Sequence, residues 1–388
     1  APGSGSAEQV STFDALGRVL AADVRSLIDV PPADNSAMDG YALRLADASV
    51  PGVVLPVSQR IPAGVVGVPL AAGTAARIFT GAQVPPGADA IAPQEHCTVT
   101  DAGVRVDTLP SPGQWVRRRG EDVARNAVVL AAGRKLSPQA LGMAASVGAA
   151  TLRVARRPRV ALFSTGDELA MPGETLKPGA IYNSNRFTLR TLIESLGGVH
   201  EDLGIVPDRL DATRDALRRA ARSADLIVTC GGVSVGEEDH LKPAVEREGR
   251  LDLWQIAMKP GKPLAFGEVF REDGSSAWFL GLPGNPVSAF VTFVMVARPV
   301  LLRLQGAPAA APRPLAMRAD FAWPGPDRRR EFLRVRRNDA GGLDLFGHQG
   351  SNVLTSTIWG DGLVDNPGGQ AIAPGDTVSY LSFLELLG

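Results

Sequence analysis

The feature that most constrains the fold is the stretch from residue 157 to residue 304, where short apolar runs alternate with segments of helical periodicity. Alternating strands and helices over about 150 residues predict a mostly parallel sheet with helices on both faces, since parallel strands need long crossover connections. Such sheets bind ligands in the loops after the carboxyl ends of their strands. We expect strands at Val160–Phe163, Leu203–Val206, Leu226–Cys230 and Ala277–Leu282, and helices at Asn185–Leu196, at Pro286–Leu304, and from an N-cap at Asp208 to Ser223.

The remaining sequence predicts three further parts, so the expected fold class is multidomain α/β plus β. Residues 1–35 and 126–156 form an N-terminal, linking α+β segment, with helical spacing at Ala15–Leu20, a short strand at Val24–Ile28 and a helix at Ser137–Val147. Residues 36–125 carry short apolar runs between Pro-Gly turns and predict a small all-β domain. Residues 157–304 form the three-layer α/β domain. Gln305–Pro314 is expected to be a linker, and residues 315–388 a C-terminal β-barrel.

Composition excludes several function classes. The chain has 40 Lys and Arg against 41 Asp and Glu, a formal net charge of −1, which argues against a nucleic-acid-binding protein. Its two cysteines and four scattered histidines show no zinc-ligand spacing. We find no apolar run near the roughly 20 residues of a membrane helix, and no secretory signal in the first nine residues. We therefore expect a cytoplasmic protein without a membrane or nucleic-acid partner.

Three expected strand ends in the α/β region carry unusual loops. Ser164–Glu168 places two acids beyond a strand, Gly231–Asp239 begins with paired glycines and contains Ser234, and Gly281–Pro286 leads into a helix start. Each loop alone also fits an ordinary tight turn or helix cap. Three such loops on one sheet edge instead favour a phosphate-sized site with carboxylates at its rim. From these loops we expect Gly231, Gly232, Ser234, Pro283 and Pro286 to bind substrate.

Two alternatives for the glycine-rich loop fail. Gly231–Gly236 has P-loop-like spacing, but Glu237 and Glu238 stand where a P-loop needs Lys and Ser or Thr. The chain also has no G-x-G-x-x-G motif, which argues against a dinucleotide enzyme. The carboxylates beside a phosphate-binding backbone suggest Mg²⁺, which needs one or two carboxylates and keeps its waters.

Two cationic segments are also candidates. Prolines flank Lys262 in the Met258–Pro263 segment, which favours fixed ammonium groups over a flexible surface pair. The Arg117–Arg119 run is either a solvated charge cluster or part of a mixed-charge loop at a site. We include Arg117 among the expected substrate-binding residues and leave the two interpretations open.

Seven motifs follow one another along the chain: Ser36–Ala42, Ile78–Ala82, Arg119–Asp122, Ser164–Leu169, Gly231–Asp239, Lys259–Pro263 and Gly281–Pro286. In this order they resemble the molybdopterin molybdenumtransferases, the family of MoeA and the gephyrin E-domain. The likeness spans nearly the whole chain. The α/β region, residues 157–304, taken alone also resembles the smaller molybdopterin adenylyltransferases.

The resemblance implies molybdenum insertion into adenylylated molybdopterin, with Mg²⁺-dependent hydrolysis of the adenylate to AMP. By motif position, Asp239 and Glu168 resemble the acidic residues that bind the metal and take part in hydrolysis. Four further residues resemble the family's remaining functional positions: Asp39, Thr80, Asp122 and Asp208. An oxyanion pocket for molybdate, a dianion, is implied at Lys259, Lys262, Pro263 and Ser288, with Arg334 and Ser351 from the C-terminal region.

The resemblance also implies a homodimer whose active site lies between the subunits. Adenylylated molybdopterin and molybdate are the implied substrates, and a molybdopterin adenylyltransferase and an apo-molybdoenzyme are possible partners. One departure is Gln255, where some relatives carry a basic residue. Two alternatives remain: a molybdopterin adenylyltransferase, and a non-catalytic scaffold of the gephyrin E-domain type.

Overall fold

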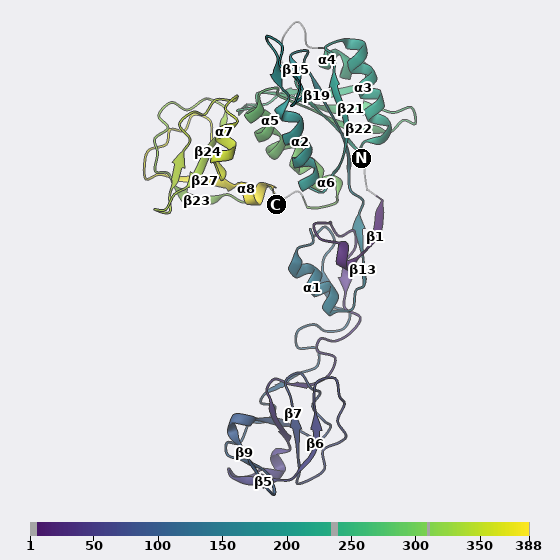
Figure 1. Cartoon of the computed structure of the whole chain (residues 1–388), viewed down its shortest axis with the longest axis vertical. Coiled ribbons are helices and arrows are strands. Elements are labelled where there is room, and N and C mark those ends of the chain that lie inside the picture. The colour runs from purple at the N-terminus through teal and green to yellow at the C-terminus, as the bar shows by residue number, and fades with distance from the viewer. Residues whose placement is uncertain (1–5, 234–239, 309–310, 388) are drawn as a thin grey trace.

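The computed structural model describes residues 6–233, 240–308 and 311–387 of the chain. The molecule is elongated (Figure 1). An α/β domain lies at one end with the C-terminal β domain beside it, a small β domain lies at the other end, and an N-terminal segment connects the two ends.

The α/β domain is built on a six-stranded mixed sheet with strand order β17-β14-β18-β22-β21-β19. The first four strands pair in parallel, and β21 and β19 add antiparallel pairs. Three of the five pairings are parallel and two are antiparallel, so the sheet is mixed and the expected mostly parallel sheet is not confirmed. The antiparallel part was not expected from the sequence. It arises because β21 joins β22 through a short turn, and a short connection can link only antiparallel neighbours. The strands are β14 (Arg159–Thr165), β17 (Val199–Val206), β18 (Leu226–Cys230), β19 (Gly249–Gln255), β21 (Pro263–Phe270) and β22 (Ser276–Leu282).

Helices cover both faces of this sheet, as Figure 1 shows. Side chains alternate along β14: Val160 and Leu162 pack with the helices of one face, and Ala161 and Phe163 with those of the other. This pattern explains the continuous apolar run, because a strand buried on both faces needs no polar positions. One face carries α2 (Ser184–Ser195), α5 (Pro286–Thr292), a π-helical turn (Phe293–Ala297) and α6 (Arg298–Leu304), and the other carries α3 (Leu210–Ser223) and α4 (Leu241–Glu248).

The expected N-cap of α3 is wrong, and the N-cap residue of α5 makes no side-chain hydrogen bond; both findings matter for the site. Helix α3 begins at Leu210, with Arg209 rather than Asp208 at the cap position. Asn285 stands at the cap position of α5, but its side chain makes no capping hydrogen bond. The side chains of Asp208 and Asn285 are therefore not used by the helix ends. By contrast, Asn183 caps α2 by accepting a hydrogen bond from the Arg186 N–H at 3.1 Å.

From the sequence we expected no apolar stretch near the length of a membrane span, but the structure contains one, the continuous helix Pro286–Leu304. By length and composition it could cross a membrane. More than half of it is buried inside the protein, where Val287, Val291 and Val294 pack in the core beneath the sheet. The beginning of the expected linker is also packed, since Gln305 donates a hydrogen bond to Leu196 O at 2.9 Å and Ala307 is buried.

The N-terminal segment contains less helix than expected. Residues Ala15–Leu20 form no α-helix, because Gly17 has a φ of +73° and interrupts it after a 3-10 turn. Val19 and Leu20 form isolated β-bridges instead. The helix capped by Ser137 is confirmed as α1 (Pro138–Ser146). It packs with β1 (Ala7–Ser11), β2 (Val24–Arg25), β12 (Val128–Leu130) and β13 (Thr151–Ala155), as well as the 3-10 turn Thr12–Asp14.

Residues 36–125 contain strands and short 3-10 turns without an α-helix, as the sequence predicted. A three-stranded sheet, β5-β10-β9, packs with a four-stranded one, β6-β7-β4-β8. Strand β3 (Asn35–Ser36) pairs with β11 (Val116–Arg117) beside them. The other strands are β4 (Gly40–Leu43), β5 (Val53–Leu55), β6 (Val57–Ile61), β7 (Ala75–Ile78), β8 (Ala90–Pro93), β9 (Cys97–Thr100) and β10 (Gly103–Val106), with 3-10 turns at Leu45–Asp47 and Gln94–His96.

The C-terminal domain is a sheet of order β20-β24-β26-β27-β23, with β25 paired to β24. Its edge strand β20 (Met258–Lys259) comes from the α/β domain and pairs in parallel with β24. The two free edges, at β23 and β25, are joined by an isolated bridge from Ala319 to Leu343 and do not pair as strands, so the expected barrel is not confirmed. The remaining elements are β23 (Leu315–Arg318), β24 (Arg330–Arg337), β25 (Leu343–Leu345), β26 (Gly362–Asn366), β27 (Thr377–Ser382), α7 (Thr355–Trp359) and α8 (Phe383–Leu387). Strands β15 (Leu169–Ala170) and β16 (Ile181–Tyr182) form a small flap over the α/β domain.

Candidate active site

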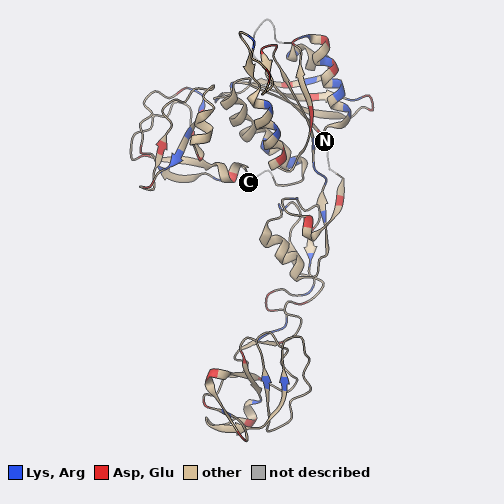
Figure 2. Ribbon diagram, viewed as in Figure 1, with Lys and Arg blue, Asp and Glu red and all other residues tan. Residues whose placement is uncertain are grey.

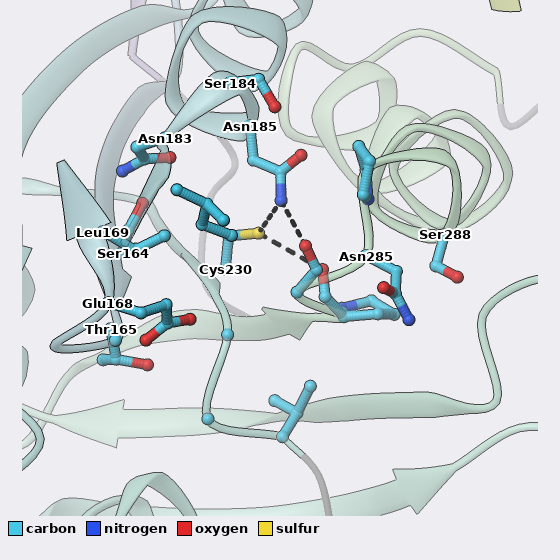
Figure 3. A pocket seen from close by; sticks show the side chains of 18 of the residues that line it. Ser164, Thr165, Glu168, Leu169, Asn183, Ser184, Asn185, Cys230, Asn285 and Ser288 are labelled. Carbon is cyan, nitrogen blue, oxygen red and sulfur yellow. Dashed lines mark hydrogen bonds between the residues drawn. The ribbon is translucent and has the colours of Figure 1, made fainter. Parts of the chain in front are cut away.

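A cavity of about 630 Å³ lies at the carboxyl ends of β14, β18 and β22 (Figure 3). The three loops selected from the sequence all line it: Ser164–Thr165–Gly166 with Glu168, Gly231–Gly232–Val233, and Pro283–Pro286. The flap of β15 and β16, the start of α2, Asp208, Pro263, Ser288 and Asn352 complete its wall. Ser234 and Asp239, both expected at this site, lie outside the described residues.

The glycine pair is required by close backbone packing. Gly231 and Gly232 have φ values of +95° and +65°, a region that residues with a Cβ rarely adopt. A Cβ on Gly231 would also approach Thr165 O to 2.5 Å. The first and second strand-end loops therefore touch through their backbones.

Asn185 connects the second and third loops. Its Nδ2 donates to Gly284 O at 2.7 Å and to Cys230 Sγ at 3.1 Å, and the Cys230 thiol donates to Pro283 O at 3.3 Å (Figure 3). Burial raises the pKa of Cys230 to about 12, so this cysteine is a neutral thiol and not a nucleophile. Asn185 was not predicted as a site residue. The feature that could have indicated it is an amide side chain in the first turn of a helix that starts beside the cavity.

Several polar atoms beneath the cavity have no partner among the described residues. They are Ser164 Oγ, Thr165 Oγ1 and Asn183 Nδ2, and each of these residues is at least 95% buried. Buried polar groups are almost always hydrogen-bonded in native proteins. All three residues line the cavity, so its wall contains polar groups whose hydrogen-bonding capacity is unused.

Carboxylates crowd one side of the cavity. Glu168 and Asp208 line it, and Asp167 accepts a hydrogen bond from the Asp208 N–H at 3.3 Å. Burial and the charges of Asp167 and Glu168 raise the pKa of Asp208. Among residues 6–233, 240–308 and 311–387, no three His, Cys, Asp or Glu side chains gather closely enough to form a metal site by themselves.

The expected oxyanion residues divide into two groups. Pro263 and Ser288 line the cavity together with Pro283 and Pro286, whereas Lys259, Lys262, Arg334 and Ser351 do not. Lys262 is exposed. Ser351 lies close to the cavity, because its carbonyl accepts a hydrogen bond from the Val287 N–H at 2.9 Å and its neighbour Asn352 is a lining residue.

Lys259 and Arg334 are held by the C-terminal domain. Lys259 Nζ lies 3.1 Å from Glu331 Oε1, a carboxylate only 1% exposed, and 3.6 Å from Asp327 Oδ2. The buried Arg334 guanidinium donates to Phe332 O, Gly350 O and Ser356 Oγ at 3.1–3.3 Å. Burial lowers the pKa of Arg334 to about 10. Arg334 therefore fixes the loop that carries Ser351 and Asn352.

The remaining expected residues belong to the small β domain and its junction, at the opposite end of the molecule (Figure 1). Asp39 accepts hydrogen bonds from Thr80, which lower the pKa of Asp39. Asp122 lies in the junction, where its N–H donates to Val30 O at 3.1 Å. Arg117 has no carboxylate partner among the described residues, whereas its neighbours Arg118 and Arg119 pair with Asp34 and Asp29. Within one chain these residues do not reach the cavity.

Family models match three consecutive parts of the chain. Residues 3–148 match the MoeA N-terminal region (domains I and II), residues 161–303 match a probable molybdopterin binding domain, and residues 316–383 match the MoeA C-terminal region (domain IV).

Curated relatives and solved structures agree with these matches. A molybdopterin molybdenumtransferase of Haemophilus influenzae is 38% identical over 98% of this chain and 95% of its own length. Gephyrin of Dictyostelium discoideum is 30% identical over 77% of this chain and 47% of its own length. A crystal structure of a molybdopterin biosynthesis MoeA protein from Pyrococcus horikoshii is 27% identical, with a TM-score of 0.85 over 97% of this chain and 95% of that one.

Proposed function

Because the chain belongs to the MoeA family of molybdopterin molybdenumtransferases, we propose that it inserts molybdenum from molybdate into adenylylated molybdopterin and releases AMP. The observation that carries the proposal is the polar cavity at the strand ends. Its paired glycines, unpartnered Ser164, Thr165 and Asn183 atoms, and adjacent carboxylates suit a substrate with a polar heterocycle and a phosphate.

Mg²⁺ fits the donors of this cavity. Glu168 and Asp208 offer oxygen ligands on one side. Burial first, and then the charges of Asp167 and Glu168, raise the pKa of Asp208, and a cation would offset the repulsion among these carboxylates. Mg²⁺ commonly combines one or two carboxylates with waters and substrate phosphate oxygens. We propose that Glu168 holds it with Asp239, near Asp208. When bound, Mg²⁺ would neutralise developing charge on the adenylate phosphate.

The chain's own residues supply binding and orientation. The Gly231–Gly232 turn and the start of α5 form the wall of the proposed phosphate region. The N–H groups of Gly231 and Val287 hold this wall in place, because they donate to Leu282 O and Ser351 O. Lys262, Ser288 and Pro263 line or flank the proposed molybdate position, and Lys259, Arg334 and Ser351 support it from the neighbouring domain. Gln255 ends β19 and leaves one expected basic contact with the substrate absent.

We propose that the active enzyme is a homodimer. Asp39, Thr80, Asp122 and Arg117 cannot act at the cavity of their own chain, since the small β domain lies at the other end of the molecule (Figure 1). A two-fold dimer would place the small β domain of one chain at the cavity of its partner. We expect a soluble cytoplasmic enzyme that receives its substrate from an adenylyltransferase and passes its product to an apo-molybdoenzyme.

The deciding experiment measures AMP release from adenylylated molybdopterin with Mg²⁺, with and without molybdate. Molybdate-dependent release, followed by activation of an apo-molybdoenzyme, is the expected result. Tight adenylate binding without AMP release would favour the scaffold that the gephyrin relative suggests. Formation of the adenylate from ATP and free molybdopterin would instead identify an adenylyltransferase.

A further inference from the structure

A second cavity, of about 560 Å³, lies at the opposite end of β21 from the candidate active site. It is formed by the last turns of α3 and α4 and by the end of β21. We call it the arginine cavity because Arg218, Arg222, Arg247 and Arg271 line it. Figure 2 shows several Lys and Arg positions, in blue, along the helices of this part of the α/β domain.

Two of the four arginines are already engaged. Arg218 donates to both carboxylate oxygens of Glu248 at 2.7 and 2.9 Å, and Arg214 also donates to Glu248. The Arg271 guanidinium donates to the carbonyls of Ala221 and Ala224 at the end of α3. These contacts neutralise Glu248 and the negative end of the helix, so both arginines form a fixed wall.

Of the other charged groups of the wall, Asp273 is engaged, because its Oδ1 accepts hydrogen bonds from the N–H and the hydroxyl of Ser275. Three further groups are available. Arg222 and Arg247 are exposed, and their side chains have no hydrogen-bond or ion-pair partner in the described parts of the chain. The same is true of the lining carboxylate Glu272. An arginine in the last turn of a helix is favoured by the negative end of the helix dipole. That effect alone does not explain why Arg222 and Arg247, from two helices, line one cavity beside the unpaired Glu272.

Phe270 adds an apolar wall to this polar set. It ends β21 and is 55% exposed although it is a large aromatic side chain. A flat ring placed against Phe270 would bury apolar surface and add a favourable ring–ring contact. The volume also lies within the range of about 300–1,000 Å³ that is usual for small-molecule pockets.

We propose that the arginine cavity binds a phosphorylated planar heterocycle, a ligand of the nucleotide class. Its phosphate would accept hydrogen bonds from Arg222 and Arg247, whose planar guanidinium groups match phosphate oxygens. Its ring would pack on Phe270, and a ring N–H or amino group would donate to Glu272. Three different features of one ligand thus satisfy the three unpartnered features of the wall.

The position of the cavity connects it to the candidate active site. Strand β21 begins at Pro263, which lines the active-site cavity, and ends at Phe270 in the arginine cavity. Helix α3 follows Asp208 and ends at the arginine cavity in the same way. A ligand in the arginine cavity would therefore contact the far ends of elements whose near ends shape the catalytic pocket.

Flavin mononucleotide is a suitable probe, because it is fluorescent, planar and phosphorylated and has a ring N–H. Riboflavin and inorganic phosphate carry its ring and its phosphate separately. We expect the full-length protein to bind flavin mononucleotide saturably by fluorescence anisotropy. Riboflavin should bind at least about tenfold more weakly, since charge-assisted hydrogen bonds to the phosphate are lost. Inorganic phosphate should compete.

Variants assign this binding to the arginine cavity. Arg222→Ala/Arg247→Ala should weaken flavin mononucleotide binding at least about tenfold without affecting riboflavin, and Phe270→Ala should weaken both. Arg219→Ala is the matched control, because Arg219 is an exposed arginine on α3 that does not line the cavity. Wild-type affinity in the double variant, equal binding of riboflavin, or absence of saturable binding would overturn the proposal. These readouts measure binding, so they are independent of turnover at the catalytic pocket.

Discussion

Asp39 and Thr80 are joined by two hydrogen bonds: Asp39 Oδ1 accepts from both the N–H and the Oγ1–H of Thr80, each at 2.8 Å. The pair joins the segment before β4 to the end of β7, 41 residues later in the chain. The family resemblance implies functional roles for both residues, yet they lie at the end of the molecule away from the cavity (Figure 1). In the homodimer that we propose, this pair would act at the cavity of the partner subunit.

Subunit complementation tests this arrangement. We expect Thr80→Ala and Glu168→Gln to be nearly inactive when each is prepared alone. Co-expressed in equal amounts, they should regain about a quarter of wild-type activity, because half of the dimers are mixed and each mixed dimer holds one intact site. Activity no higher than the sum of the separate variants would show that the two residues serve the same chain.

Asp208 is expected to lower stability at neutral pH. Its folded-state pKa is raised, so the folded protein binds the proton more tightly than the unfolded chain. Stability from this group is therefore lost as pH rises from the unfolded pKa through the raised folded pKa. Asp208→Asn should raise the melting temperature at pH 7–8 by about 1–3 °C while lowering activity. Calorimetry at pH 4 should show a smaller difference; an equal gain at both pH values would contradict this explanation.

Lys259 and Glu331 should show strong coupling. Glu331 is almost fully buried, whereas the Lys259 side chain is 39% exposed. Lys259→Met would leave a buried carboxylate whose remaining contact is the Trp323 Nε1–H, and should cost about 3 kcal/mol. Glu331→Gln leaves a cation that water can reach and should cost about 1–2 kcal/mol. In denaturant unfolding, the double variant should lose less than the sum; additive losses would show that the pair is not coupled.

Lys262 is expected to affect molybdate binding and not folding. Its side chain is exposed, so Lys262→Ala should leave the melting temperature unchanged. The molybdate concentration for half-maximal AMP release should rise about tenfold, since one charge-assisted contact is removed. Lys242→Ala, an exposed lysine on α4 outside the cavity, is the control. An unchanged molybdate requirement would remove Lys262 from the anion site.

Gly231→Ala should damage the active site through its backbone. The positive φ and the 2.5 Å approach to Thr165 O should cost about 1–3 kcal/mol and separate the first two loops. Gly274→Ala is the matched control: Gly274 has a φ of +80°, but its Cβ would meet nothing within 4 Å. We expect the control to cost about 1 kcal/mol and to retain activity. Equal losses of activity in both variants would contradict the role of close packing.

The sequence predicted the elements whose signal is local. Buried strands such as Leu226–Cys230 are continuous apolar runs, and the helix after Ser137 has a cap and a proline in the expected places. Elements set by tertiary contacts were missed. Strand β19 alternates between partly buried and exposed residues, and two-residue strands such as β20 have no periodicity. Helical spacing at Ala15–Leu20 was misleading, because a single glycine at positive φ overrides it.

The same division applies to the site. Glycine pairs and acids after strands were visible as motifs, and the loops that carry them meet at one cavity. The engagement of Lys259 by Glu331, and of Arg334 by carbonyls, depends on how the C-terminal domain packs, which no spacing in the sequence encodes. Asn185 was missed for a similar reason, because its partners are the Gly284 carbonyl in a loop and the Cys230 thiol at the end of β18.

Strand β20 gives the C-terminal domain an unusual dependence. Its two residues, Met258 and Lys259, come from the α/β domain and cover the edge of β24 by pairing with Arg330 and Glu331. A fragment starting after the Gln305–Pro314 segment would lack this strand and expose an open strand edge, which favours aggregation. The point at which the chain passes from one domain to the next is thus not the limit of the unit that folds. A C-terminal domain expressed in isolation needs a strand equivalent to Met258–Lys259 grafted onto it.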